Sequence, residues 1–484
     1  MNLLWNAFSW NYFLQAAAVL FLLDWVFYLP IFTSLFAIEK GCEWKPQPAG
    51  RVVLAAGGWL LTIGIAGFGP EPLRCVGWGV LWMIFRLLFI QRRWSSVRRG
   101  CGAPGFMSHW TALWIFLVEL GRQVDGTGWL GEQIFMALRM DFAVIMICAG
   151  TYKAAVGFLR GNGMEFGRVN PIWGYHWKYF FQKNPAGFYP KLMNVLAASG
   201  EIVAGILLLV PHPWSQIPGA LLVCLSFLYV SFFIRLGRLA ALMVLLPLLY
   251  HPGILKSAMI GAGGTAQLPS SWLFFLAIPF WAFMAMLPLI KVTQYYNLFA
   301  NRVIPEPLQS LVTIMADRIP VIVWRVFTPD VINFFVRIYT WENGRKTLVV
   351  GEDNVYSYHK WKRPWFKLRF LHVTESIALV SVFTTLKYFP SKALLFEERL
   401  LRYAQSVSAS LASPCSQMEF EYVAIRKTPT GWDFHPAFSC LADLKDLKIS
   451  RQVLDKNFDP SVPALFSPVR ESTRPGSLEP AIQS

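Results

Sequence analysis

Long apolar runs interrupted by few charges recur through the first three-fifths of the chain. A membrane-spanning helix needs about 20 mostly apolar residues, and hydrocarbon restricts the backbone to structures that satisfy their own hydrogen bonds. Candidate runs occur at residues 12–38, 52–68, 73–90, 106–120, 134–158, 192–210, 217–234, 239–250 and 272–290. The pattern predicts an all-α polytopic membrane helix bundle of about eight to nine spans over residues 1–291.

Composition supports this interpretation. Charged residues make up 15% of the 484 residues, whereas soluble proteins have about 25%. The formal net charge is +16, which in a membrane protein indicates cytoplasmic loops and contacts with anionic lipid headgroups. We expect membrane lipid, and no nucleic acid, as a partner, because the sequence contains no nucleic-acid recognition module.

The connections between runs predict a topology. If the N-terminus lies outside, Lys and Arg concentrate in the inner connections, as the positive-inside rule requires. This places the C-terminal region of a multi-pass cell-membrane protein in the cytoplasm. Segment 239–250 is short and contains Pro247, so both a crossing and a re-entrant segment remain open. Re-entry would move the C-terminal region to the other face. The N-terminus lacks a basic n-region, so we expect no cleaved signal peptide.

The character of the chain changes after residue 291. Pro305 and Pro307 indicate a linker, and residues 301–459 predict a smaller, basic α+β extramembrane domain. Its expected strands are 331–339 and 347–358, joined by a turn at Asn343-Gly344, and then 419–426 and 432–434. Its expected helices are 375–389 and 392–411. Residues 460–484 are rich in Ser and Pro and are predicted to be a disordered tail.

Several charged residues lie inside the apolar runs, where charge is costly and usually functional. They are Asp24, Arg86, Glu119, Arg139, Asp141, Lys153 and Glu201. A Lys153–Glu201 pair across neighbouring helices is geometrically possible. Burial disfavours the charged form of a lysine, and such a lysine can act as a general base. The alternative is that these charges pair to hold the bundle together or extend to the interface.

Other motifs narrow the chemistry. The seven histidines form no H-x-x-H pair, which excludes a metal-dependent membrane desaturase or hydroxylase, and the seven cysteines form no C-x-x-C pair, so no metal site is expected. The aromatic connection that contains Trp173 and His176 is typical of a headgroup-level belt or of a substrate entrance. Basic residues alternate with aromatic residues over residues 359–369. This favours a membrane-surface patch over a single-stranded nucleic-acid groove.

Residues 139–163, RMDFAVIMICAGTYKAAVGFLRGNG, contain an arginine, an apolar helix and an A-G-x-x-K segment that ends at Lys153. With the helix at 194–201 and its glutamate, this region resembles the horizontally transferred transmembrane (HTTM) domain shared with vitamin K-dependent gamma-carboxylase. It is also similar to the membrane region of lipase maturation factors. Residues 324–330 and 383–403 are similar to the segment that follows the bundle in HTTM proteins, so the resemblance covers about residues 139–406.

The resemblance implies a pocket that faces a lipid or an isoprenoid quinone, because the lysine of A-G-x-x-K in the carboxylase is the base toward vitamin K hydroquinone. The carboxylase has two adjacent lysines and then an aspartate-tryptophan pair, whereas Ala154 and an arginine-glycine loop follow here. The carboxylase also holds its C-terminal region in the lumen, whereas the charge pattern of this chain places that region in the cytoplasm. Gamma-carboxylation is therefore not implied. The expected catalytic residues are Lys153 and Glu201, with a substrate pocket of Arg139, Asp141, Tyr152, Trp173 and His176.

Two other functions compete with this prediction. A non-enzymatic membrane assembly factor or structural subunit would dock a protein partner through the C-terminal region, where the basic aromatic segment 360–369 lies. A transporter would show two related halves with broken helices, and only segment 239–250 is broken, so the transporter ranks last.

Overall fold

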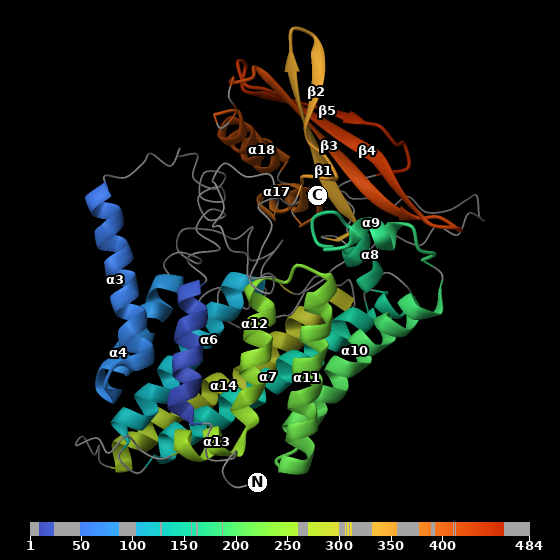
Figure 1. Cartoon of the computed structure of the whole chain (residues 1–484). Helices are drawn as coiled ribbons and strands as arrows, with labels where there is room; N and C mark the ends of the chain where they lie inside the picture. Colours follow the sequence, from blue (N-terminus) through green and yellow to red (C-terminus); the bar gives the residue numbers. More distant parts are fainter. Residues whose placement is uncertain are drawn as a thin grey trace.

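The structure is a computed structural model of the whole chain (Figure 1). It describes residues 9–23, 49–86, 103–125, 128–155, 157–160, 163–185, 187–259, 270–299, 332–355, 377–388, 393–409 and 413–458, together with 305, 307, 308, 310, 311 and 411. Asp24, the basic segment 359–369, the stretch 324–330 and the tail 460–484 lie outside the described residues, as does most of the linker.

The first part of the chain forms a body of packed helices, and the sheet of the C-terminal part lies beyond one end of it (Figure 1). The long helices of this body are Trp10–Leu23, α3 (Ala49–Phe68), α4 (Glu71–Arg86), α6 (Ala103–Val124), α7 (Trp129–Ala155), α10 (Phe188–Leu209), α11 (Pro213–Phe233) and α14 (Ser270–Phe299). Shorter helices are η2 (Phe158–Arg160), α8 (Met164–Val169), α9 (Trp177–Phe181), α12 (Arg238–Leu245), η3 (Leu246–Tyr250) and α13 (Pro252–Met259).

Small residues bring α7 and α10 into close contact. A Cβ atom on Gly150 would lie 2.4 Å from the carbonyl oxygen of Ala198, and one on Gly205 would lie 2.7 Å from that of Ala143. Small residues at helix contacts allow backbones to approach this closely in membranes. The two helices therefore have little space for larger side chains where they cross.

The outer faces of α10 and α11 are apolar and their inner faces carry the polar groups. Leu196, Val203 and Leu225 are among the exposed residues, whereas Glu201 and Gln216 are buried. A soluble helix has the opposite arrangement, so these faces fit contact with lipid.

Three described helices, α7, α10 and α11, are long and apolar enough to cross a membrane. A fourth candidate is the pair Leu239–Tyr250 and Pro252–Ala258, which bends by 75° at its break. The expectation of helices that fit a membrane protein is confirmed, and so is that of a mostly helical chain with a small sheet. The count of eight to nine spans stays a prediction.

The connection between α7 and α10 folds against the end of α11. Gly174 forms an isolated antiparallel bridge with Ile234. The guanidinium of Arg235 donates hydrogen bonds to the carbonyl oxygens of Pro171, Ile172 and Gly174 at 2.7–3.2 Å. These bonds satisfy loop carbonyls that would otherwise be buried without a partner.

The C-terminal part contains one five-stranded antiparallel sheet of order β2-β1-β3-β4-β5. Its strands are β1 (Phe334–Glu342), β2 (Arg345–Val350), β3 (Gln417–Lys427), β4 (Trp432–Asp443) and β5 (Lys448–Val453). The expected turn at Asn343-Gly344 is confirmed, with φ of 50° and 77°, as suits a two-residue hairpin. Strand β5 has no counterpart among the predicted strands, and β4 is longer than predicted.

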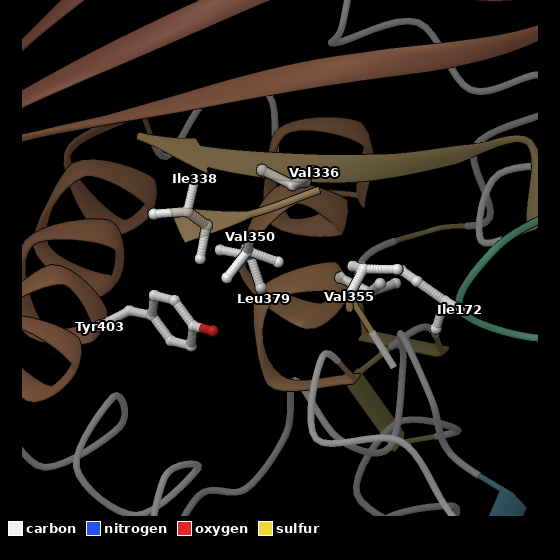
Figure 2. Close-up of a pocket in the computed structure, with 8 residues that line it drawn as sticks. Ile172, Val336, Ile338, Val350, Val355, Leu379 and Tyr403 are labelled. Atoms are coloured by element: carbon white, nitrogen blue, oxygen red, sulfur yellow. The ribbon is translucent and has the colours of Figure 1, made fainter. Parts of the chain in front are cut away.

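Helices α17 (Ile377–Tyr388) and α18 (Ala393–Ser408) cover one face of the sheet. The ring of Phe383 contacts those of Phe334, Phe396 and Tyr422, which joins both helices to the sheet. Figure 2 shows a gap beside this core. It is lined by Ile172, Val336, Ile338, Val350, Val355, Leu379, Val380 and Tyr403 and is too narrow to hold a water molecule. It is a small apolar void within the packing of the sheet against its helices.

Candidate functional site

Lys153 and Glu201 form a buried ion pair between α7 and α10. The ammonium group of Lys153 donates a hydrogen bond to Oε1 of Glu201. The two residues are only 4% and 6% exposed. The Nζ atom lies 6.0 Å from the ring centroid of Phe158, which follows α7. The pairing that the sequence allows is therefore present.

The positions of both residues follow from helix periodicity. On α10 the buried residues are Asn194, Ala198, Glu201, Ala204, Gly205 and Leu208, a stripe that repeats every three or four residues. Glu201 thus lies on the face that packs against α7. Lys153 follows Gly150 by three residues, so it lies on the same side of α7 where the two helices approach.

The carboxylate of Glu201 is only half satisfied. Its Oε2 atom is buried and has no hydrogen-bond partner among the described residues. Buried polar atoms almost always have a partner, and an unmade hydrogen bond to a charged group is costly. The free oxygen is therefore suited to accept a hydrogen bond from a ligand hydroxyl or from water.

Asp141 provides a comparison within the same helix. Its two oxygens accept hydrogen bonds from Lys291 of α14 at 2.6 Å and from the indole of Trp110 at 2.8 Å. Asp141 and Lys291 are as buried as Lys153 and Glu201. Because both carboxylate oxygens are occupied, this pair has the features of a structural contact.

Arg139 lies away from Lys153. Fourteen residues of helix separate them by about 21 Å. The Arg139 guanidinium donates a hydrogen bond to Gln216 of α11 and lies 4.6 Å from the ring centroid of Tyr250. The structure thus brings Lys153 and Glu201 together and places Arg139 and Asp141 in two other contacts.

The remaining predicted pocket residues are also dispersed. Tyr152 is buried in α7, and Trp173 is buried in the connection, where its carbonyl oxygen accepts a hydrogen bond from the Arg235 amide. His176 is exposed and precedes α9. Their role as one substrate pocket stays a prediction.

Three polar residues that the sequence analysis missed form a chain of hydrogen bonds from this stripe of α10, through α8, to the sheet. Asn194, two turns before Glu201, donates a hydrogen bond of 2.7 Å to Oε2 of Glu165 in α8. Oε1 of Glu165 accepts another from Lys427 of β3 at 2.6 Å. The seven-residue spacing of Asn194 and Glu201 was a usable signal, because it places both on one helix face.

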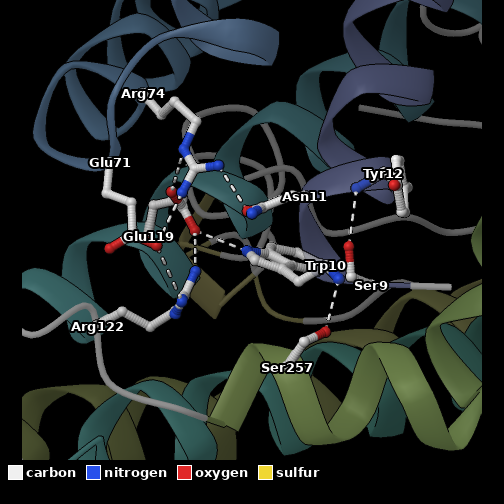
Figure 3. A network of polar contacts seen from close by, with 9 residues as sticks. All are labelled: Ser9, Trp10, Asn11, Tyr12, Glu71, Arg74, Glu119, Arg122 and Ser257. Atoms are coloured by element: carbon white, nitrogen blue, oxygen red, sulfur yellow. Dashed lines mark hydrogen bonds and ion pairs between the residues drawn. The ribbon is translucent and has the colours of Figure 1, made fainter. Parts of the chain in front are cut away.

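A second network of buried charges lies around Glu119 of α6 (Figure 3). Its carboxylate accepts hydrogen bonds from the indole of Trp10 at 2.6 Å and from Arg122 at 2.9 Å. Arg74 and Glu71 of α4 complete a set with equal numbers of opposite charges. Arg86 instead lies over the ring of Trp82, with its Cζ 5.6 Å from the centroid. These contacts join the first helix to α4 and α6 and favour the structural interpretation of Glu119.

No cluster of three His, Cys, Asp or Glu side chains within the described ranges is arranged to hold a metal ion. Comparison of the chain with family models, with curated proteins and with solved structures gives no match. The fold alone therefore defines the class of the protein. It is a mostly helical protein that contains helices long and apolar enough to cross a membrane.

Proposed function

We propose that this chain is a polytopic, HTTM-like integral membrane protein whose bundle binds a lipid or an isoprenoid quinone beside Lys153 and Glu201. The observation that carries the proposal is the buried Oε2 of Glu201, which has no partner among the described residues. A hydroxyl of a membrane-dissolved ligand would complete its hydrogen bonding. In this proposal segment 239–250 crosses the membrane, so that the chain crosses nine times and its C-terminal region lies in the cytoplasm.

The Lys153–Glu201 pair suits base assistance, which the sequence analysis expected of Lys153. In this proposal Glu201 takes the proton-accepting role instead, because the Lys153 ammonium group donates a hydrogen bond to Oε1 and has no lone pair. A carboxylate held beside an ammonium group in a dry site accepts a hydrogen bond and exchanges a proton with the group that donates it. A quinone, when bound, would supply a hydroxyl in its reduced form. Glu201 would accept the hydrogen bond, Lys153 would stabilise the carboxylate, and Phe158 would exclude water. The exposed apolar faces of α10 and α11 support entry of such a ligand from the bilayer.

Co-purified ligands test this proposal. Glu201→Gln and Asp141→Asn would be purified in parallel from membranes in a mild detergent, and their bound quinones and lipids would be measured by mass spectrometry. We expect Glu201→Gln to lose a ligand that the wild type retains. Asp141→Asn, which changes a fully satisfied carboxylate, should retain it. The same lipid and quinone content in all three proteins would contradict the proposal.

A non-enzymatic assembly factor remains the second candidate. The observation that favours it is strand β5, which among the described strands pairs with β4 alone and is mostly exposed along Lys448–Val453. A strand edge of this kind can accept a strand from a partner. A stoichiometric protein that co-purifies with the full chain, and is lost when residues 301–484 are deleted, would support this function over the first.

A further inference from the structure

We infer that Arg168, Tyr189 and Tyr229 form a binding site for a phosphate group, and that the headgroup of a membrane phospholipid supplies it. The inference rests on the membrane placement in the proposed function but concerns a different site from the Lys153–Glu201 pair.

Arg168 of α8 is a buried cation in an aromatic cage. It is 3% exposed. Its Cζ lies 4.8–5.8 Å from the ring centroids of Phe180, Tyr189, Tyr229 and Phe233. Aromatic faces attract a cation, but they do not supply the lone pairs that the guanidinium N–H groups need. Among the described residues Arg168 has one hydrogen-bond acceptor, the hydroxyl of Tyr229, whereas the buried Arg235 has three carbonyl oxygens, so a further acceptor that also carries negative charge is expected beside Arg168.

The described part of the chain provides no such anion. No carboxylate there forms an ion pair with Arg168, and its Nε is buried without a hydrogen-bond partner. Glu165, one turn earlier on the same short helix, pairs with Lys427 instead. Arg168 thus differs from Lys153 and Lys291, which each have a carboxylate.

Two hydroxyls connect the buried cation to the surface. The guanidinium of Arg168 donates a hydrogen bond of 3.0 Å to the hydroxyl of Tyr229, which is hydrogen-bonded to that of Tyr189. Tyr189 is 46% exposed. The guanidinium has only donors, and each hydroxyl adds one. The three groups therefore offer more donors than acceptors, and a phosphate, which has several acceptor oxygens, would balance them.

The location favours a lipid as the source of the phosphate. Tyr189 is the second residue of α10, and Tyr229 lies in the last turns of α11, so both stand at the ends of apolar helices. Phe188, beside Tyr189, is 79% exposed. Exposed aromatics at helix ends are typical of the headgroup level, and the exposed Lys183 and Lys191 flank the site in sequence.

The test uses the full chain in maltoside detergent with three probes: dihexanoyl phosphatidic acid, dihexanoyl glycerol, which lacks the phosphate, and inorganic phosphate. Binding would be measured by native mass spectrometry. We expect the phosphatidic acid to bind and the diacylglycerol not to bind. Tyr189→Phe and Tyr229→Phe should each weaken phosphatidic acid binding about tenfold. Tyr179→Phe, an exposed tyrosine of neighbouring α9 outside the cage, should bind like the wild type.

Arg168→Gln should abolish binding, and the two tyrosine variants keep the test decisive if Arg168→Gln does not fold. Equal binding of the diacylglycerol, or unchanged binding by both tyrosine variants, would overturn the inference. Displacement of the lipid by equimolar inorganic phosphate would overturn the lipid source. Binding by a Lys153→Met/Glu201→Met variant should be normal, and this outcome separates the phosphate site from the proposed function.

Discussion

Lys427 of strand β3 donates a hydrogen bond of 2.6 Å to Glu165 of helix α8, across 262 positions of sequence. The side chain of Glu165 is only 6% exposed, so the sheet reaches a buried acid at the end of the helical body. A second contact lies nearby, where Asn170 donates hydrogen bonds of 2.8 Å to the carbonyl oxygens of Ile332 and Phe334. The two contacts join the sheet to the connection that leads into α10.

Lys427→Met should loosen this junction. The change leaves the buried Glu165 without its cation, which we expect to cost about 2 kcal/mol. Hydrogen exchange of residues 163–170, followed by mass spectrometry, should become faster. Lys445→Met, at an exposed position of the turn before β5, is the control and should leave the exchange unchanged. Equal protection in both variants would show that the ion pair does not hold the junction.

Gly150 should be intolerant of a side chain. A Cβ there would lie 2.4 Å from the carbonyl oxygen of Ala198 and 2.6 Å from Cγ1 of Ile202. Gly150→Ala should therefore force α7 and α10 apart and reduce stability by about 1–3 kcal/mol. Gly200→Ala on α10 meets no atom within 4 Å, and it should be neutral or stabilise the helix by up to about 1 kcal/mol. Unfolding by SDS titration in mixed micelles measures both.

A lysine on the exposed apolar face of α11 tests whether this face contacts lipid. Leu225 is 62% exposed near the middle of α11. In a bilayer Leu225→Lys should cost about 2.5–3.5 kcal/mol, and membrane-inserted protein should decrease in a carbonate extraction. Leu394→Lys in α18, where the leucine is 74% exposed outside the helical body, should change stability by less than about 0.5 kcal/mol. Equal tolerance of the two lysines would mean that α11 faces water.

The alkylation rate of the Cys440 thiol measures how well the folded sheet buries this residue. Burial raises the pKa of its thiol to about 12 from an ordinary value of 9.0. At pH 8 the folded protein should therefore react with iodoacetamide at this residue about 1000-fold more slowly than the urea-unfolded chain, since only the thiolate reacts. The fold holds this proton more tightly than the unfolded chain does, so stability should decline as the pH rises above about 9. Peptide mass spectrometry of the alkylated site gives the rate, and similar rates in both states would refute the burial.

Those features that short stretches of neighbouring residues encode could be predicted from the sequence alone. The Lys153–Glu201 pair was accessible because each residue is an isolated charge within an apolar run, and the Asn343-Gly344 turn has a specific dipeptide signature. Strand β5 was missed because Lys448–Val453 contains few apolar residues and is exposed along most of its length, so it lacks the apolar alternation that identifies a half-buried strand. The Lys427–Glu165 contact was inaccessible because tertiary packing alone brings the two residues together.

Removal of both charges of the proposed site should weaken ligand binding while the bundle still folds. Lys153→Met alone leaves a buried carboxylate and should destabilise the bundle by about 3–5 kcal/mol, whereas Lys153→Met/Glu201→Met replaces the pair with apolar groups and should fold. The matched control is Asp141→Met/Lys291→Met, which removes the pair whose carboxylate is fully satisfied.

The most direct measurement is a titration of each folded double variant, and of the wild type, with a short-chain isoprenoid quinol in detergent. The account predicts that Lys153→Met/Glu201→Met binds the quinol at least about tenfold more weakly than the wild type, while Asp141→Met/Lys291→Met binds it normally. Equal affinity in all three proteins, or a loss confined to the Asp141–Lys291 variant, would contradict it.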